Sequence, residues 1–125
     1  MRRAAALVAL LAAAGASAHW PSADDVLAEI GGPEGRAAGV VEVRRDAAVA
    51  RVLLVRVGSR WHALSAGRRL ELADAWREHW RRAVPGGEVG VLDAATGRPA
   101  VNYDGRGRAR LAPPAPPPGT AATPP

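Results

Sequence analysis

Residues 49–57, VARVLLVRV, carry the strongest strand signal in the chain. Valine and leucine dominate this segment, and both side chains suit the pleated, buried surface of a sheet. Because successive side chains point to opposite faces, both faces of the strand are apolar, with Val52 and Leu54 on the same face. Strands of this kind normally lie where both faces are covered. Either the strand is central in a small core, or its second face meets another subunit.

Turn and helix signals on both sides of this segment divide the chain into short elements. Ser22, followed three residues later by Asp25, is close to a capping box, so we expect a short helix that ends at Gly31. Apolar residues at helical spacing predict a longer helix over residues 66–84. Runs rich in β-forming residues predict three further strands, at residues 39–45, 88–93 and 99–104.

The order of these elements, α-β-β-α-β-β, predicts an α+β fold. We expect two layers, with one antiparallel four-stranded sheet and both helices on one face. The predicted domain covers residues 19–111, which suits a single small domain. Residues 112–125 are rich in proline and alanine, and this composition predicts a disordered C-terminal tail.

The N-terminal residues 1–18 have the three parts of a secretory signal peptide. Two arginines supply the positive start, residues 4–14 form an apolar run, and an A-x-A cleavage site ends at Ala18. The run falls well short of the ~20 apolar residues that span a bilayer, so no transmembrane anchor is expected after cleavage. We therefore expect the mature chain to begin at His19 and to be exported to the periplasm or the extracellular space.

The composition argues against several classes of protein. The chain has no cysteine, which excludes a disulfide framework, a thiolate metal site and a cysteine nucleophile. All 17 basic residues are arginine, and 12 residues are acidic. Removal of the signal peptide lowers the net charge from +5 to +3, which is weak for electrostatic binding of nucleic acid. No nucleic-acid partner is expected.

The chain contains four tryptophans, one tyrosine and no phenylalanine. Trp76 and Trp80 share the apolar face of the long predicted helix, which makes them core residues. Trp61 precedes that helix, and two roles remain open for it: attaching its loop to the core, or presenting a ring to a ligand such as a sugar. The neighbouring His62 lies in a connecting segment, where functional residues are common.

Motifs for catalysis are missing from the sequence. Ser59, Ser65, His62 and Asp93 would supply the parts of a hydrolytic triad, yet no G-x-S-x-G or comparable signature surrounds them. The glycine-rich segment at residues 31–35 follows a helix, whereas a phosphate-binding loop joins a strand to a helix. We therefore expect neither enzymatic activity nor an organic cofactor.

His19 is the one candidate metal ligand. As the first residue of a mature chain it would offer an amine and an imidazole, which together chelate Cu(II). A further imidazole could come only from His62 or His79, and no H-x-H spacing supports such a site. Copper binding at His19 is one alternative, and a histidine without function on a frayed terminus is the other.

The predicted function is binding to a protein partner, without catalysis. The partner could be a second copy in a homodimer, because about 90 ordered residues without disulfides form a marginal core. The candidate surface residues are Val52, Leu54, Trp61, His62, Arg106, Arg108 and Arg110. A further hypothesis is an inhibitor of a secreted enzyme, with the loop of residues 93–99 inserted into the cleft of the enzyme.

Overall fold

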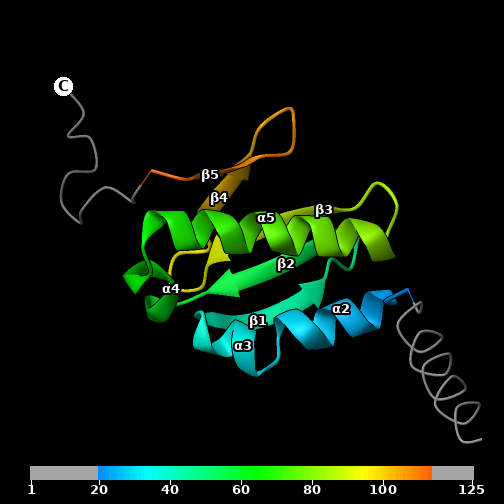
Figure 1. The fold of residues 1–125 in the computed structure, drawn as a ribbon, viewed down its shortest axis with the longest axis horizontal. Coiled ribbons are helices and arrows are strands. Elements are labelled where there is room, and N and C mark those ends of the chain that lie inside the picture. The colour runs from blue at the N-terminus through cyan, green and yellow to red at the C-terminus, as the bar shows by residue number, and fades with distance from the viewer. Residues whose placement is uncertain (1–19, 114–125) are drawn as a thin grey trace, which may run out of the picture.

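A five-stranded sheet forms the centre of the protein (Figure 1). The computed structural model describes residues 20–113, and the strands follow one another across the sheet in chain order. They are β1 (Val40–Arg45), β2 (Val52–Val57), β3 (Glu88–Asp93), β4 (Pro99–Tyr103) and β5 (Ala109–Leu111). The fold is thus mixed α+β, as the sequence predicts. The predicted signal peptide and residues 114–125 of the predicted tail lie outside the described residues.

The strand directions correct the prediction of a four-stranded antiparallel sheet. β1 pairs with β2, β3 with β4, and β4 with β5 in antiparallel fashion. β2 and β3 run parallel, because a helical crossover between them returns the chain to the same end of the sheet. β5 was missed because its three residues are too few to show an alternating pattern. The prediction was therefore wrong in the number of strands and in the direction of one pair.

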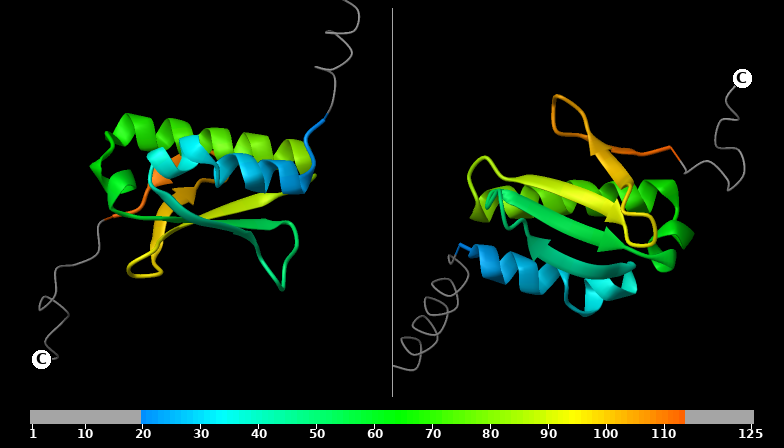
Figure 2. Two further views of the ribbon diagram at one scale, coloured as in Figure 1. Left: turned by 90° about the horizontal axis from the view of Figure 1, so that it is seen from below. Right: turned by 180° about the vertical axis from the view of Figure 1, so that it is seen from behind.

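Helices cover one face of this sheet (Figure 2). They are α2 (Ala23–Ile30), α3 (Pro33–Ala37), α4 (Ser59–Ala63) and α5 (Ala66–Ala83). α5 packs against β3 and β5, while α2 contacts both β1 and α5. The capping box predicted for α2 is present: the Asp25 N–H donates to Ser22 Oγ over 3.2 Å, and the Ser22 N–H donates to the Asp25 carboxylate over 2.9 Å. The five-residue helices α3 and α4 were not predicted, because neither is long enough for helical periodicity.

Tryptophan side chains fill the space between helices and sheet. Trp80 is fully buried, and its indole N–H donates to the carbonyl of Arg51 over 2.9 Å. Trp76 is also buried and stacks on Trp61, with ring centroids 5.3 Å apart and 25° between the ring planes. The core positions predicted for Trp76 and Trp80 are confirmed. The aliphatic part of the core on the sheet is Val40, Leu53, Val55, Val57, Val89, Val91 and Val101.

Tyr103 ties β4 to the long helix. Its hydroxyl donates a hydrogen bond of 2.8 Å to the carbonyl of Ala73 in α5. Burial, together with the negative charge of Asp74, raises the pKa of this phenol far above its ordinary value. The fold therefore holds Tyr103 as a neutral hydrogen-bond donor that fixes the distance between α5 and the sheet.

Gly39 joins α3 to β1 at a point where two segments of backbone touch. Its φ angle is 100°, a conformation that residues with a Cβ atom rarely adopt. A Cβ atom at this position would overlap the backbone nitrogen and Cα of Trp61. The Gly39 carbonyl also accepts a 2.9 Å hydrogen bond from the N–H of Gly58, just before α4. Only glycine allows the start of β1 and the start of α4 to approach this closely.

The substitution Gly39→Ala is expected to lower the free energy of unfolding by about 3 kcal/mol, since it combines backbone strain with steric overlap. The matched control is Gly67→Ala in α5, where a Cβ atom meets no neighbour within 4 Å. That change is expected to raise the free energy of unfolding by about 0.5–1 kcal/mol, because alanine favours a helix. Urea unfolding followed by tryptophan fluorescence measures both. Equal effects of the two substitutions would contradict the close packing of Gly39.

Candidate functional site

A pocket of about 540 Å³ lies where α4, the first turn of α5, the β3–β4 loop and β5 come together. We call it the α4 pocket. Apolar residues from β4 and β5, among them Ala100 and Leu111, form part of its lining. The polar and aromatic groups of its lining are Trp61, His62, Arg69, Asp93, Thr96, Arg98 and Asn102. A volume of this order is typical of sites that hold small molecules.

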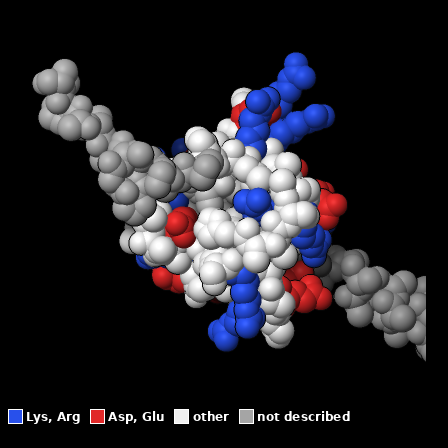
Figure 3. Space-filling view, turned by 90° about the vertical axis from the view of Figure 1, so that its left-hand side faces the viewer, with Lys and Arg blue, Asp and Glu red and all other residues white. Residues whose placement is uncertain are grey.

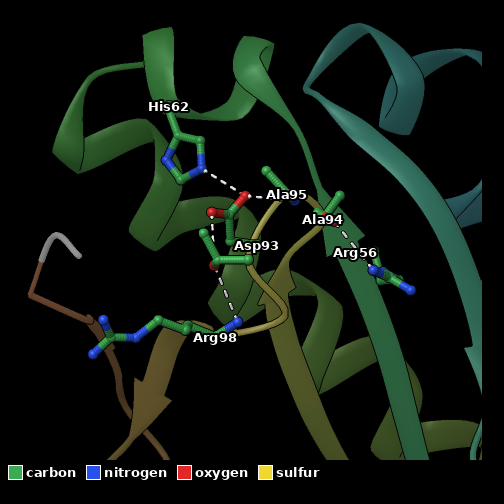
Figure 4. A network of polar contacts seen from close by, with 7 residues as sticks. Arg56, His62, Asp93, Ala94, Ala95 and Arg98 are labelled. Atoms are coloured by element: carbon green, nitrogen blue, oxygen red, sulfur yellow. Dashed lines mark hydrogen bonds and ion pairs between the residues drawn. The ribbon is translucent and has the colours of Figure 1, made fainter. Parts of the chain in front are cut away.

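Asp93, the last residue of β3, organises the loop at the mouth of this pocket (Figure 4). Its carboxylate accepts hydrogen bonds from the N–H of Ala95 over 3.2 Å and from Thr96 Oγ1 over 3.0 Å. Gly97, with a φ angle of 71°, completes the turn and donates its N–H to the Asp93 carbonyl over 2.7 Å. The loop of residues 93–99 is therefore held by its own hydrogen bonds. Such order is what the hypothesis of an inhibitory loop requires, and that hypothesis stays a prediction.

The same hydrogen bonds keep Asp93 ionised. The N–H of Ala95 contributes most to lowering the pKa of the carboxyl, followed by the Thr96 hydroxyl and His62, and they outweigh the opposing effect of burial. The His62 ring is a further partner of this carboxylate, with its Nε2 atom 3.4 Å from Asp93 Oδ1. The structure thus brings together two of the residues singled out in the sequence.

α4 explains how His62 reaches the pocket. Trp61 and His62 are neighbours in this short helix, and the Trp61 ring is fully buried in the core while 46% of the His62 side chain is exposed. Of the two roles left open for Trp61, attachment to the core is the one the structure shows. Burial of the indole fixes the orientation of α4, and this places the imidazole next to Asp93.

Two nitrogen atoms in this region lack an acceptor. Trp61 Nε1 and Arg69 Nε are both buried and have no hydrogen-bond partner within the described part of the chain. Both residues line the α4 pocket. Arg69 and Arg98 were not singled out from the sequence, because arginines are frequent throughout the chain and no spacing distinguishes these two. Only the fold brings them together with Trp61 and His62.

Two of the hydroxyl groups close to His62 and Asp93 have structural roles. Ser65 Oγ accepts the N–H of Arg68 over 3.2 Å and caps α5. Thr96 Oγ1 donates to Asp93 and accepts from the N–H of Arg98 over 3.2 Å. Ser59 lies in the first turn of α4, whose N-cap is Gly58. The contact between His62 and Asp93 orients the imidazole at the rim of the pocket.

Val52 and Leu54 lie on the sheet face that the helices leave uncovered (Figure 2). Both are half-buried, and a Cβ atom added to Gly90 would lie 3.1 Å from Leu54 Cδ2, so the leucine covers this glycine of β3. The strand register places charged residues of β1 and an additional leucine of β3 on the same face. We call this surface the open face; it comprises Glu42, Arg44, Val52, Leu54, Arg56, Glu88, Gly90 and Leu92.

Arg106, Arg108 and Arg110 belong to the turn between β4 and β5 and to β5 itself. Basic side chains extend from the molecule at the top of Figure 3, on the side where Figure 1 places this turn. Asp104 orders the turn, and the N–H groups of Arg108 and Arg106 lower the pKa of its carboxyl. The candidate surface residues of the sequence therefore lie in different places: the open face, the α4 pocket and this turn.

The remaining histidines do not form a metal site among residues 20–113. His79 of α5 has its Nε2 atom 2.6 Å from a carboxylate oxygen of Glu29, which links α5 to α2. Within this range no group of three or more His, Cys, Asp or Glu side chains is arranged to hold a metal ion. His19, the candidate copper ligand, lies outside the described residues.

Comparison with protein-family models, with curated proteins and with solved structures finds no match to this chain. Among the residues that the structure describes, no helix is sufficiently long and apolar to cross a membrane. The α4 pocket and the open face are the two features of the described residues that point to a function.

The substitution Asp93→Asn is expected to lower the free energy of unfolding by about 1 kcal/mol at pH 7, since the loop loses charge-assisted hydrogen bonds. The pKa of Asp93 is lowered in the folded state, so its contribution is complete above the unfolded pKa of about 3.9 and is lost as the pH falls through the folded pKa. The difference between variant and wild type should therefore shrink toward about pH 2.

Urea unfolding at several pH values measures this difference. The control is Glu71→Gln, which removes an exposed ion pair with Arg68. It is expected to change the free energy of unfolding little at any of these pH values. A difference between Asp93→Asn and wild type that stays constant from neutral to acid pH would contradict the role of the ionised carboxylate.

Proposed function

We propose that this chain is an exported binding protein that acts through its open face, without catalysis. The observation that carries the proposal is the uncovered side of the sheet. The helices pack on one face (Figure 2), and the alternating burial of β2 and β3 places aliphatic side chains on the other. Val52, Leu54 and Leu92 are half-buried there. An apolar strip with a charged border is the usual composition of a protein interface.

The charges of the open face favour a second copy of the chain as the partner. Glu42 lies between two arginines, with Arg44 Nε 3.5 Å and Arg56 Nη1 3.9 Å from its carboxylate oxygens. A surface that carries both signs of charge around an apolar centre can pair with itself across a twofold axis, because arginines of one copy can then face Glu42 or Glu88 of the other. A dimer would also bury apolar surface that a small domain without disulfides leaves exposed.

Export is supported by residues 1–18, whose sequence has the charge, the apolar run and the cleavage site of a signal peptide. A binding protein of this size, placed outside the cytoplasm, is best described as an accessory protein of the cell envelope.

The substitution Leu54→Glu tests the interface. We expect wild-type protein to have the mass of a dimer in light scattering at tens of micromolar, and Leu54→Glu to have the mass of a monomer, because it would bury an unpaired charge. Leu70→Glu is the matched control: Leu70 is also half-buried, but it lies on α5, outside the core cluster and away from the open face. This variant should remain dimeric. A monomeric mass for the wild type would overturn the dimer.

Export is tested separately, by expressing the full chain with a C-terminal tag in a Gram-negative bacterium. We expect to find the tagged protein in the periplasmic fraction, with the mass of a chain that begins at His19. Ala18→Leu should block cleavage, because signal peptidase requires a small residue at this position, whereas Ala14→Leu in the apolar run should be cleaved normally. A full-length protein that stays in the cytoplasm would contradict export.

A further inference from the structure

The α4 pocket contains donors without acceptors. A buried donor that lacks an acceptor costs about 1–3 kcal/mol, so folded proteins rarely retain such groups. Trp61 Nε1 and Arg69 Nε are two such donors; both atoms are covered, and they belong to two residues that line one pocket. Two unsatisfied donors at one site indicate that an acceptor from outside the chain completes it.

The charge of the pocket shows what kind of acceptor fits. Arg69 and Arg98 line the pocket, and neither guanidinium forms an ion pair with a carboxylate in the described range 20–113. Figure 4 shows the Arg98 guanidinium extending away from Asp93. Asp93 is the single acid of the lining, and its oxygens already accept hydrogen bonds from the loop and lie close to His62. The charged groups left for a ligand are therefore the two guanidinium groups, beside the neutral side chains of Asn102 and Trp61.

The position of Arg69 strengthens this preference. Arg69 lies in the first turn of α5, an 18-residue helix whose N-terminal end carries the positive end of the helix dipole. An anion at this end is stabilised by the dipole and by the guanidinium together. Arginine also matches the paired oxygens of carboxylates and phosphates, with which it forms two parallel hydrogen bonds.

We propose that the α4 pocket binds a small organic oxyanion, with its carboxylate or phosphate on Arg69 and Arg98 and its apolar part against Ala100 and Leu111. Trp61 Nε1 donates to the same ligand. Because Trp61 Nε1 and Arg69 Nε are covered in the free protein, binding includes a shift of the side chains that cover them. This site is separate from the open face, so ligand binding and dimerisation can be tested independently.

Phenylacetate and phenyl phosphate serve as probes, and neutral phenylacetamide serves as the control ligand. We expect each anion to shift the indole N–H signal of Trp61 in a nitrogen–proton correlation spectrum of the full chain. Trp61→Phe identifies this signal among the four tryptophans. Phenylacetamide should bind about tenfold more weakly, since it lacks the charge that the guanidinium groups recognise.

The substitution Arg98→Ala is expected to raise the dissociation constant of the anions about tenfold, because the complex loses one charged hydrogen bond. The control is Arg106→Ala, on the β4–β5 turn and outside the pocket lining, which should leave the dissociation constant unchanged. Tighter binding of phenylacetate assigns the site to carboxylates, and tighter binding of phenyl phosphate assigns it to phosphates. Equal binding of the neutral amide, or no shift of the Trp61 signal at millimolar anion, would overturn the proposal.

Discussion

The rest of the structure depends on the packing of Trp61 in the core. Its ring stacks on Trp76 of α5, and its backbone lies against Gly39, which has no Cβ atom to keep the two segments apart. Three parts of the chain meet at this residue: the start of β1, α4 after β2, and the long helix. Because Trp61 fixes the path of the chain out of β2, α5 can cross over the sheet, and β3 then adds parallel to β2.

The same burial positions the candidate site. His62 follows Trp61 directly, so the rigid attachment of one side chain to the core places the next one beside Asp93. On the other side of the pocket, Ser65 caps α5 and holds its first turn, from which Arg69 extends. The pocket is thus lined by side chains whose backbone positions are set by core packing and helix capping. Core packing and capping therefore fix the backbone around the pocket, while the side chains that cover Trp61 Nε1 and Arg69 Nε still have to shift when a ligand binds.

Much of this fold follows from local sequence signals, and the rest depends on pairing over long distances. The capping box at Ser22 and the helix face with Trp76 and Trp80 are local patterns, and they predicted α2, α5 and the buried positions of these two tryptophans. The parallel β2–β3 pair depends on where α5 docks, and β5 is too short for a pattern. His62 and Asp93, 31 residues apart, were recognised as candidates, but Arg69 and Arg98 resemble many other arginines of the chain.

Arg56 connects the open face with the loop of the α4 pocket. Its side chain lies on the open face, where Nη1 is 3.9 Å from a carboxylate oxygen of Glu42, while Nη2 donates to the carbonyl of Ala94 over 3.2 Å (Figure 4). Ala94 follows Asp93 directly, so this hydrogen bond restrains the loop that bears the carboxylate. Thr96 and Arg98 of the same loop line the α4 pocket, so the Arg56–Ala94 hydrogen bond helps to hold the rim of the pocket from the side of the open face.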